Sequence, residues 1–172
     1  MLQVSCVGHS QLPHNLSVPE TEIKIFRAPG GRADNFFSDH RLNDVLDWEH
    51  DFCILWLGSN DIEVDTDPNE LFEEIKEIYE TIANDCGAVV HVCLIEPRFY
   101  PGTSPIDSDS YRKIQNSVNK KIKRKLTTNT THFTASNFVE ALSGDGVHWN
   151  AEGKEMVRDK LESVIATYRD SE

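Results

Sequence analysis

A serine near the start of the chain and a histidine and an aspartate near its end are the residues best suited to nucleophilic catalysis. Ser10 follows an apolar stretch that begins at Leu2. Asp145 and His148 stand three positions apart on a glycine-containing stretch. An aspartate so placed can fold back and accept a hydrogen bond from Nδ1–H of the histidine, which leaves Nε2 free to act as a base toward a serine hydroxyl. The pattern predicts Ser10 as nucleophile, His148 as base and Asp145 as the residue that orients it.

Each of these pieces also has a commoner structural explanation. A serine directly after a strand usually caps a helix or occupies a turn. A lone Asp-x-x-His is more often an incidental surface loop. The catalytic interpretation depends on all the pieces occurring together, each at a strand end or in a loop.

Two further segments could supply hydrogen-bond donors to a developing oxyanion. Gly30 and Gly31 end one predicted strand, and their backbone N–H groups are not shielded by a Cβ atom. Asn60 comes shortly after another predicted strand, and its side-chain amide can donate as well. The N–H groups of Gly30 and Gly31 and the amide of Asn60 are therefore candidate donors to an oxyanion.

The elements that must position these residues are read from the apolar pattern. Continuous apolar runs predict buried strands, and apolar residues three to four positions apart predict amphipathic helices. Strands are expected at residues 2–10, 22–27, 52–57, 88–95 and 132–134. One or two short helices are expected within residues 33–48. Longer helices are expected at 68–84, 111–126 and 150–168, and a short one at 138–142.

Strands that alternate with helices predict an α/β fold with a parallel sheet between two helical layers. We expect a three-layer, flavodoxin-like domain with five strands in the order 2-1-3-4-5, formed by residues 1–172 as one unit. Ligands of such sheets bind outside the carboxyl ends of the strands, beside the first strand. Ser10, the Gly30–Gly31 pair and Asn60 each follow a different strand at that edge.

Composition narrows the classes of function. A net charge of −12 disfavours attraction to nucleic-acid phosphates or anionic lipids. Its four cysteines lack the spacing of a zinc site and are interpreted as free, buried thiols. An acidic loop at residues 61–67 lacks the glycine of a calcium loop. We therefore expect neither a zinc nor a calcium site. Because the sequence has no signal peptide and no long apolar run, we expect a cytoplasmic location.

One helix departs from this acidic character. Residues 111–126 have an apolar stripe and, opposite it, seven Lys or Arg residues. A solvated face is the commoner explanation, and contact with RNA or an acidic partner is the alternative. Only Tyr111 could offer a stacking platform, so strong nucleic-acid binding by this domain is not expected.

Taken together, the blocks 8–10, Gly31, 58–61 and 145–148 resemble the four signature blocks of the SGNH (GDSL-like) hydrolases, in the same order and over nearly the whole chain. The resemblance implies a serine esterase without cofactors. Its implied catalytic residues are Ser10, Asp145 and His148, and its implied oxyanion donors are Ser10, Gly31 and Asn60. His9 stands where the family usually has aspartate, and the Gly-x-Ser-x-Gly elbow of the α/β-hydrolases is absent.

A looser resemblance connects the chain to the esterase domains of the first-open-reading-frame proteins of non-LTR retrotransposons. It rests on residues 7–10, 29–32, 96–98 and 111–119. It implies that the natural chain continues beyond these residues, with a segment through which the full-length protein oligomerises.

The sequence therefore predicts hydrolysis of small, acetyl-type esters of lipids or carbohydrates. It identifies no further substrate-binding residues. The alternative is a catalytically weak or inactive module that keeps the fold for protein or RNA interaction.

Overall fold

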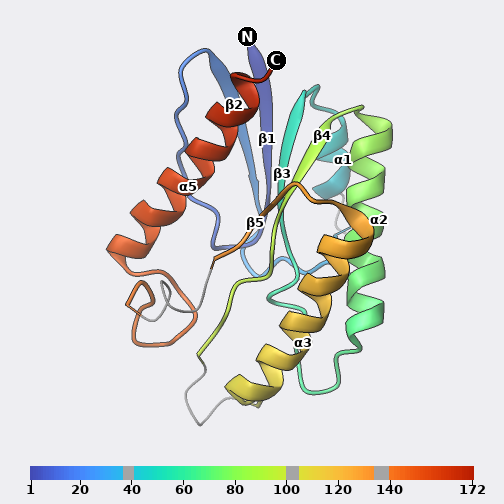
Figure 1. Cartoon of the computed structure of the whole chain (residues 1–172), viewed down its shortest axis with the longest axis vertical. Coiled ribbons are helices and arrows are strands. Elements are labelled where there is room, and N and C mark those ends of the chain that lie inside the picture. Colours follow the sequence, from blue (N-terminus) through green and yellow to red (C-terminus); the bar gives the residue numbers. More distant parts are fainter. Residues whose placement is uncertain (37–40, 100–104, 134–139) are drawn as a thin grey trace.

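The computed structural model describes residues 1–36, 41–99, 105–133 and 140–172. Its centre is a parallel sheet in the order β2-β1-β3-β4-β5 (Figure 1). This arrangement confirms the predicted fold class and strand order. The strands are β1 (Leu2–Gly8), β2 (Thr21–Arg27), β3 (Phe52–Trp56), β4 (Val89–Cys93) and β5 (Thr130–Thr131).

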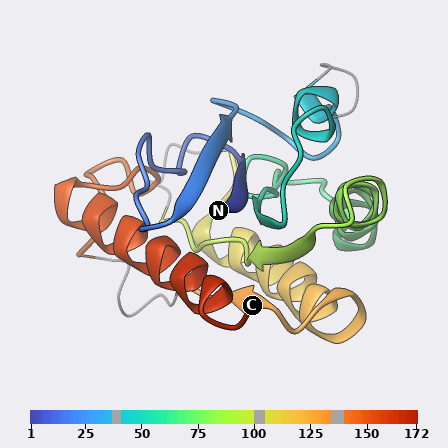
Figure 2. The ribbon, with the colours of Figure 1, turned by 90° about the horizontal axis from the view of Figure 1, so that it is seen from above.

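Helices cover both faces of the sheet. Figure 2 shows α5 (red) and α2 (green) on opposite sides of it. The helices are α1 (Arg41–Leu46), α2 (Pro68–Asp85), α3 (Ser108–Lys121), which continues into the π-helix η1 (Ile122–Leu126), and α5 (Ala151–Arg169).

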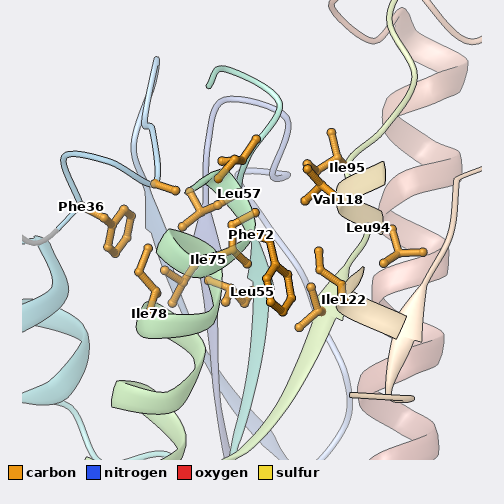
Figure 3. Packing of buried hydrophobic residues seen from close by; sticks show 14 of the residues in the cluster. Phe36, Leu55, Leu57, Phe72, Ile75, Ile78, Leu94, Ile95, Val118 and Ile122 are labelled. Carbon is orange, nitrogen blue, oxygen red and sulfur yellow. The ribbon is translucent and has the colours of Figure 1, made fainter. Parts of the chain in front are cut away.

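Successive residues of the central strands pack into two different hydrophobic cores, one on each face of the sheet. Leu55 of β3 packs with side chains of α1, α2 and α3, including Phe72 and Ile75 (Figure 3). Its neighbours Ile54 and Trp56 point the other way and pack with α5. Because all five residues of β3 are buried, its run is apolar without interruption.

Both long flanking helices begin at a side-chain cap. Asp67 accepts a hydrogen bond from the N–H of Asn69 at the start of α2, with Pro68 at the first helical position. Asn150 accepts one from the N–H of Gly153 at the start of α5. This second cap determines where α5 begins, directly after the loop that carries His148.

Several predicted boundaries are wrong. The last strand lies at Thr130–Thr131 rather than at residues 132–134, because pairing with Val92 and Cys93, and not side-chain type, decides a strand of two residues. The expected helix at 138–142 falls largely outside the described residues, and Leu142 pairs with Trp149 in an isolated bridge. Within 33–48 only α1 is helical among the described residues.

The cysteine prediction is correct for three of the four thiols. Cys6, Cys53 and Cys93 are free and buried, whereas Cys86 is only partly buried at the end of α2. In the described part of the chain, no helix is both long and apolar enough to cross a membrane. The same ranges contain no group of three or more His, Cys, Asp or Glu side chains placed to hold a metal ion.

Candidate active site

The turn after β1 brings Ser10 to the carboxyl edge of the sheet. Gly8 lies so close to β3 that a Cβ atom there would be 2.4 Å from the carbonyl oxygen of Trp56, so only glycine fits. The next residue, His9, donates its N–H to that same oxygen at 3.3 Å. The chain then turns, with Leu12 N–H bonded to His9 O, and leaves Ser10 partly exposed.

The predicted pair of Asp145 and His148 is formed. Nδ1 of His148 lies 2.6 Å from Oδ2 of Asp145, while Oδ1 of Asp145 accepts the N–H groups of Val147 and His148 at 2.9 and 3.0 Å. These three hydrogen bonds, from the imidazole first, lower the pKa of Asp145 to about 2. A charged Asp145 holds the proton of His148 on Nδ1, which leaves Nε2 as the basic nitrogen.

Glycine is required in this loop as well. Gly146 has φ +71°, and a Cβ atom there would lie 1.7 Å from the carbonyl oxygen of Phe99. The N–H of Phe99 in turn donates to Gly146 O at 2.9 Å. The segment after β4 therefore anchors the loop that carries the histidine.

Ser10 and His148 come from opposite ends of the chain and line the same cavity, of about 490 Å³. A hydrogen bond of 2.5 Å from Nε2 of Gln11 to the carbonyl oxygen of Val147 joins their two loops. Within the described residues, no hydrogen bond links the Ser10 hydroxyl to the His148 ring. Hydrogen bonds of this kind are often long in resting enzymes and tighten when substrate binds.

Asn60 is held at both ends of its amide. Its Oδ1 accepts from Nη2 of Arg98 at 2.8 Å, and its Nδ2 donates to the carbonyl oxygen of Gly31 at 3.0 Å. The amide nitrogen has a second hydrogen, which Gly31 does not use. The amide group of Asn60 therefore lies next to the glycine loop after β2.

Gly31 lies where the sequence predicts, yet its N–H is already engaged. It donates to the carbonyl oxygen of Ala28 at 2.8 Å, closing the turn after β2. To serve an oxyanion, this N–H would have to leave Ala28. The N–H of Ser10 makes no hydrogen bond within the described residues and is available.

The side chain of His9 is fully buried and is directed toward Ser59 and Glu96. Its Nδ1 accepts the N–H of Gln11 at 3.3 Å, so its proton is on Nε2. That Nε2 lies 3.1 Å from Oγ of Ser59 and 3.6 Å from Oε2 of Glu96. The His9 ring therefore connects the turn that carries Ser10 to the buried side chains of Ser59 and Glu96.

Glu96 is the carboxylate at the centre of this buried network. Oε2 accepts from Nε1 of Trp56 at 2.9 Å, and Oε1 lies 3.6 Å from Nη2 of Arg98. Burial by itself would raise the pKa of Glu96. The interactions with His9 and Arg98 outweigh burial and lower the pKa to about 2. The site thus rests on a charged, buried Glu96–Arg98 pair.

Asp61 connects the Asn60 turn to the glycine loop. Its Oδ1 accepts the N–H groups of Ala33 at 2.8 Å and Asp34 at 3.4 Å. Its other oxygen, Oδ2, is buried without a hydrogen-bond partner. Burial, opposed by these N–H groups and by Arg32, raises the pKa of Asp61 to about 6.

Sequence reasoning did not assign roles to Glu96, Arg98, Ser59, Gln11 or Arg27. The available signal was a glutamate and an arginine on either side of Pro97, directly after a buried strand. Charged residues at that edge of a parallel sheet face the ligand side. Their partners could not be identified, because Ser59 and Trp56 are about forty positions away along the chain.

Comparison with known proteins gives structural neighbours only. No family model matches the chain, and no curated protein sequence matches it. An acetyl xylan esterase, AlAXEase, superimposes with a TM-score of 0.73 at 15% identity, covering 95% of this chain and 100% of its own. A carbohydrate esterase family 3 protein from Talaromyces cellulolyticus gives 0.73 at 13% identity, with 100% of both chains covered.

A GDSL-like lipase from Bacteroides thetaiotaomicron also gives a TM-score of 0.73, at 17% identity, with 96% of this chain and 88% of the lipase covered. Identities this low compare folds and not individual residues. The chain therefore has the fold of GDSL-type esterases and acylhydrolases.

Proposed function

We propose that this chain is a single SGNH-type serine esterase domain that hydrolyses small, acetyl-type carboxylic esters. One observation carries the proposal above the others. A charged Asp145, bonded to Nδ1 of His148, leaves Nε2 as a base in the same cavity as Ser10. That is the acid, base and nucleophile arrangement that ester hydrolysis through an acyl-enzyme needs.

The first step forms the acyl-enzyme. Oγ of Ser10 attacks the ester carbonyl while Nε2 of His148 takes its proton. The oxyanion that develops is stabilised by the N–H of Ser10 and the free hydrogen of Nδ2 of Asn60, with Gly31 as the further predicted donor. The carbonyl then re-forms, and the alcohol leaves with the proton from His148.

The second step releases the acid. Nε2 of His148 takes a proton from water, which attacks the acyl group on Ser10. The tetrahedral intermediate collapses, and Oγ of Ser10 takes the proton back. No metal or cofactor takes part in this scheme. Lipid and carbohydrate acetyl esters are both candidate substrates, and two of the structural neighbours are described as an acetyl xylan esterase and a carbohydrate esterase.

The experiment that tests this proposal combines labelling and kinetics. Wild type should react with a fluorophosphonate probe and hydrolyse p-nitrophenyl acetate, and Ser10→Ala should lose both activities while keeping its melting temperature. Labelling that persists in Ser10→Ala would contradict the assignment of the nucleophile.

A second candidate is a weak or inactive module that keeps this fold for protein or RNA interaction. The bond from Gly31 N–H to Ala28 O favours it, because this N–H is not presented to an oxyanion. Absence of labelling and hydrolysis in a folded protein would favour this module. Tight RNA binding with a steep salt dependence would then assign a role to the exposed basic residues on α3 and η1.

The resemblance to the esterase domains of non-LTR retrotransposon proteins supports a proposal about the protein to which this domain belongs. It is consistent with an esterase domain of a retrotransposon-encoded, cytoplasmic protein that oligomerises through a segment outside these residues.

A further inference from the structure

The cavity beside Ser10 is lined by more positive than negative charge, although the whole chain carries a net charge of −12. Three cationic side chains line it, Arg27, Lys154 and Arg158, against one carboxylate, Glu155. A cationic lining is unusual for the surface of an acidic protein. It indicates a site for a negatively charged group.

Arg27 is in direct contact with the residue proposed as nucleophile. It ends β2, and its Nη2 donates to the carbonyl oxygen of Ser10 at 2.6 Å. The carbonyl oxygen of Ser10 accepts one N–H of the guanidinium but is neutral, so it does not compensate the positive charge of Arg27. Its Nε is buried without a hydrogen-bond partner, and no carboxylate lies within ion-pair distance of Arg27 among the described residues. A half-buried guanidinium in this state can bind an anion without first breaking a salt bridge.

The other two cations stand on one face of α5. Lys154 and Arg158 are four positions apart, on either side of the buried Val157. Lys154 makes no ion pair within the described residues, while Nε of Arg158 lies 3.7 Å from Oδ1 of Asp159. Lys154 is thus the more available charge.

The chemistry of the proposed esterase decides which part of the substrate this cavity takes. The leaving alcohol receives its proton from Nε2 of His148, so it must lie on the His148 side of Ser10. His148 lines this cavity, whereas Asn60, which binds the carbonyl oxygen, lines a different one with Glu63 and Asp65. The alcohol group therefore faces Arg27, Lys154 and Arg158.

We infer that this enzyme prefers esters whose alcohol part carries an anionic group, a carboxylate or a phosphate. The inference rests on the proposed esterase function and specifies its substrate class. The small acyl group lies toward Asn60, and the anion of the alcohol lies toward Arg27 and Lys154.

The test compares acetyl esters that differ in the charge of the leaving group. Values of kcat/KM are measured for 4-acetoxybenzoate, for 4-acetoxyphenyl phosphate and for the neutral 4-acetoxybenzamide. The preference is kcat/KM for an anionic ester divided by kcat/KM for the neutral ester. Wild type and variant are compared by this ratio, because differences in intrinsic reactivity between the esters affect both proteins equally. The benzoate and phosphate arms distinguish a carboxylate from a phosphate ligand.

Lys154→Gln should lower the preference about threefold to fivefold, the size expected of one partly exposed charge. Arg158→Gln should lower it less, because Asp159 already offsets that charge. Lys160→Gln is the matched control. Lys160 is exposed on the same helix and outside the cavity lining, and its charge acts on His91 of β4 instead. Added salt should reduce the wild-type preference.

Equilibrium binding separates failure of the inference from failure of the proposed function. 4-Hydroxybenzoate and phenyl phosphate should bind Ser10→Ala more tightly than 4-hydroxybenzamide does, and Lys154→Gln should remove part of the difference. If Ser10 hydrolyses the neutral ester and neither measurement depends on Lys154, the inference is wrong and the esterase stands. If no ester is hydrolysed but the anions still bind through Lys154, the esterase is wrong and the anion site stands.

Discussion

Arg98 holds the oxygen of the Asn60 amide, with Nη2 of Arg98 2.8 Å from Oδ1 of Asn60. The same nitrogen donates to Oγ of Ser59 at 2.8 Å. With Oδ1 held by Arg98, the amide cannot flip, and its NH₂ group faces the carbonyl oxygen of Gly31 at 3.0 Å. The orientation of the proposed oxyanion donor is therefore determined by a residue on the segment after β4.

Replacing Asn60 tests the donor directly. Asn60→Ala should lower kcat by roughly 10²–10³-fold with little change in KM, because the lost hydrogen bond forms only in the transition state. Steady-state kinetics and a melting curve check this. If the variant lost melting temperature but kept a near-normal kcat per folded molecule, Asn60 would be a turn residue only.

Arg98 should act on the reaction through Asn60. Arg98→Lys keeps a positive charge near Glu96 but loses the planar group that holds Ser59 and Asn60 together, so kcat should fall about 10-fold to 100-fold as the donor is misplaced. In an Asn60→Ala background the same substitution should change kcat little. Additive effects in this double-mutant cycle would show that Arg98 does not work through Asn60.

His9 should matter for stability more than for chemistry. His9→Ala leaves a cavity beneath the nucleophile turn and removes a partner of buried Ser59 and Glu96, a loss of roughly 2–4 kcal/mol in the free energy of unfolding. Urea unfolding measures this, with Ser10→Ala as the control, because Ser10 is partly exposed. A variant that melts normally yet is as inactive as Ser10→Ala would assign His9 to the reaction instead.

Because the pKa of Glu96 is lowered in the folded protein, the free energy of unfolding should decrease at acid pH. The pKa of Glu96 is lowered from 4.5 to about 2 in the folded protein, so its contribution is fully present above pH 4.5 and is lost as pH falls toward 2. Glu96→Gln should be less stable than wild type at pH 7, and the difference should shrink between pH 4.5 and 2.5.

Asp145→Asn is the control for that measurement. The pKa of Asp145 is lowered as well, from 3.8 to about 2, but its side chain is half exposed, so solvent screens its contribution. Its effect on the pH dependence should be the smaller of the two. A wild-type to Glu96→Gln difference that is constant across this pH range would mean that Glu96 is not charged in the folded protein.

We expect kcat/KM to fall as the acyl chain of the ester becomes longer. A domain of 172 residues has few side chains left over to build a deep tunnel for a long apolar acyl chain, so the proposed substrate carries a small acyl group. A panel of p-nitrophenyl esters from acetate to laurate should show the highest kcat/KM at acetate. A steady rise toward laurate would overturn the small-acyl preference.

The fold and the residues proposed for the chemistry could be predicted from local patterns in the sequence. Buried parallel strands must be apolar on both faces, so β1, β3 and β4 are evident as runs, and the sheet order follows from the alternation with helices. Ser10 and Asn60 each follow such a run closely, and Asp145 and His148 stand three positions apart on a glycine-containing loop. For this reason Ser10, Asn60, Asp145 and His148 could be named in advance.

The contacts that support these residues and set their charge could not be predicted, because they join segments far apart in the chain. The contacts of Glu96, Arg98 and His9 join segments about forty to ninety positions apart, and no local pattern specifies which buried charge meets which. The bond between Gly31 and Ala28 depends on backbone direction in a turn, which glycine leaves open. The cationic lining of the cavity arises because the end of β2 meets the start of α5 beside Ser10, a juxtaposition that exists only once the chain is folded.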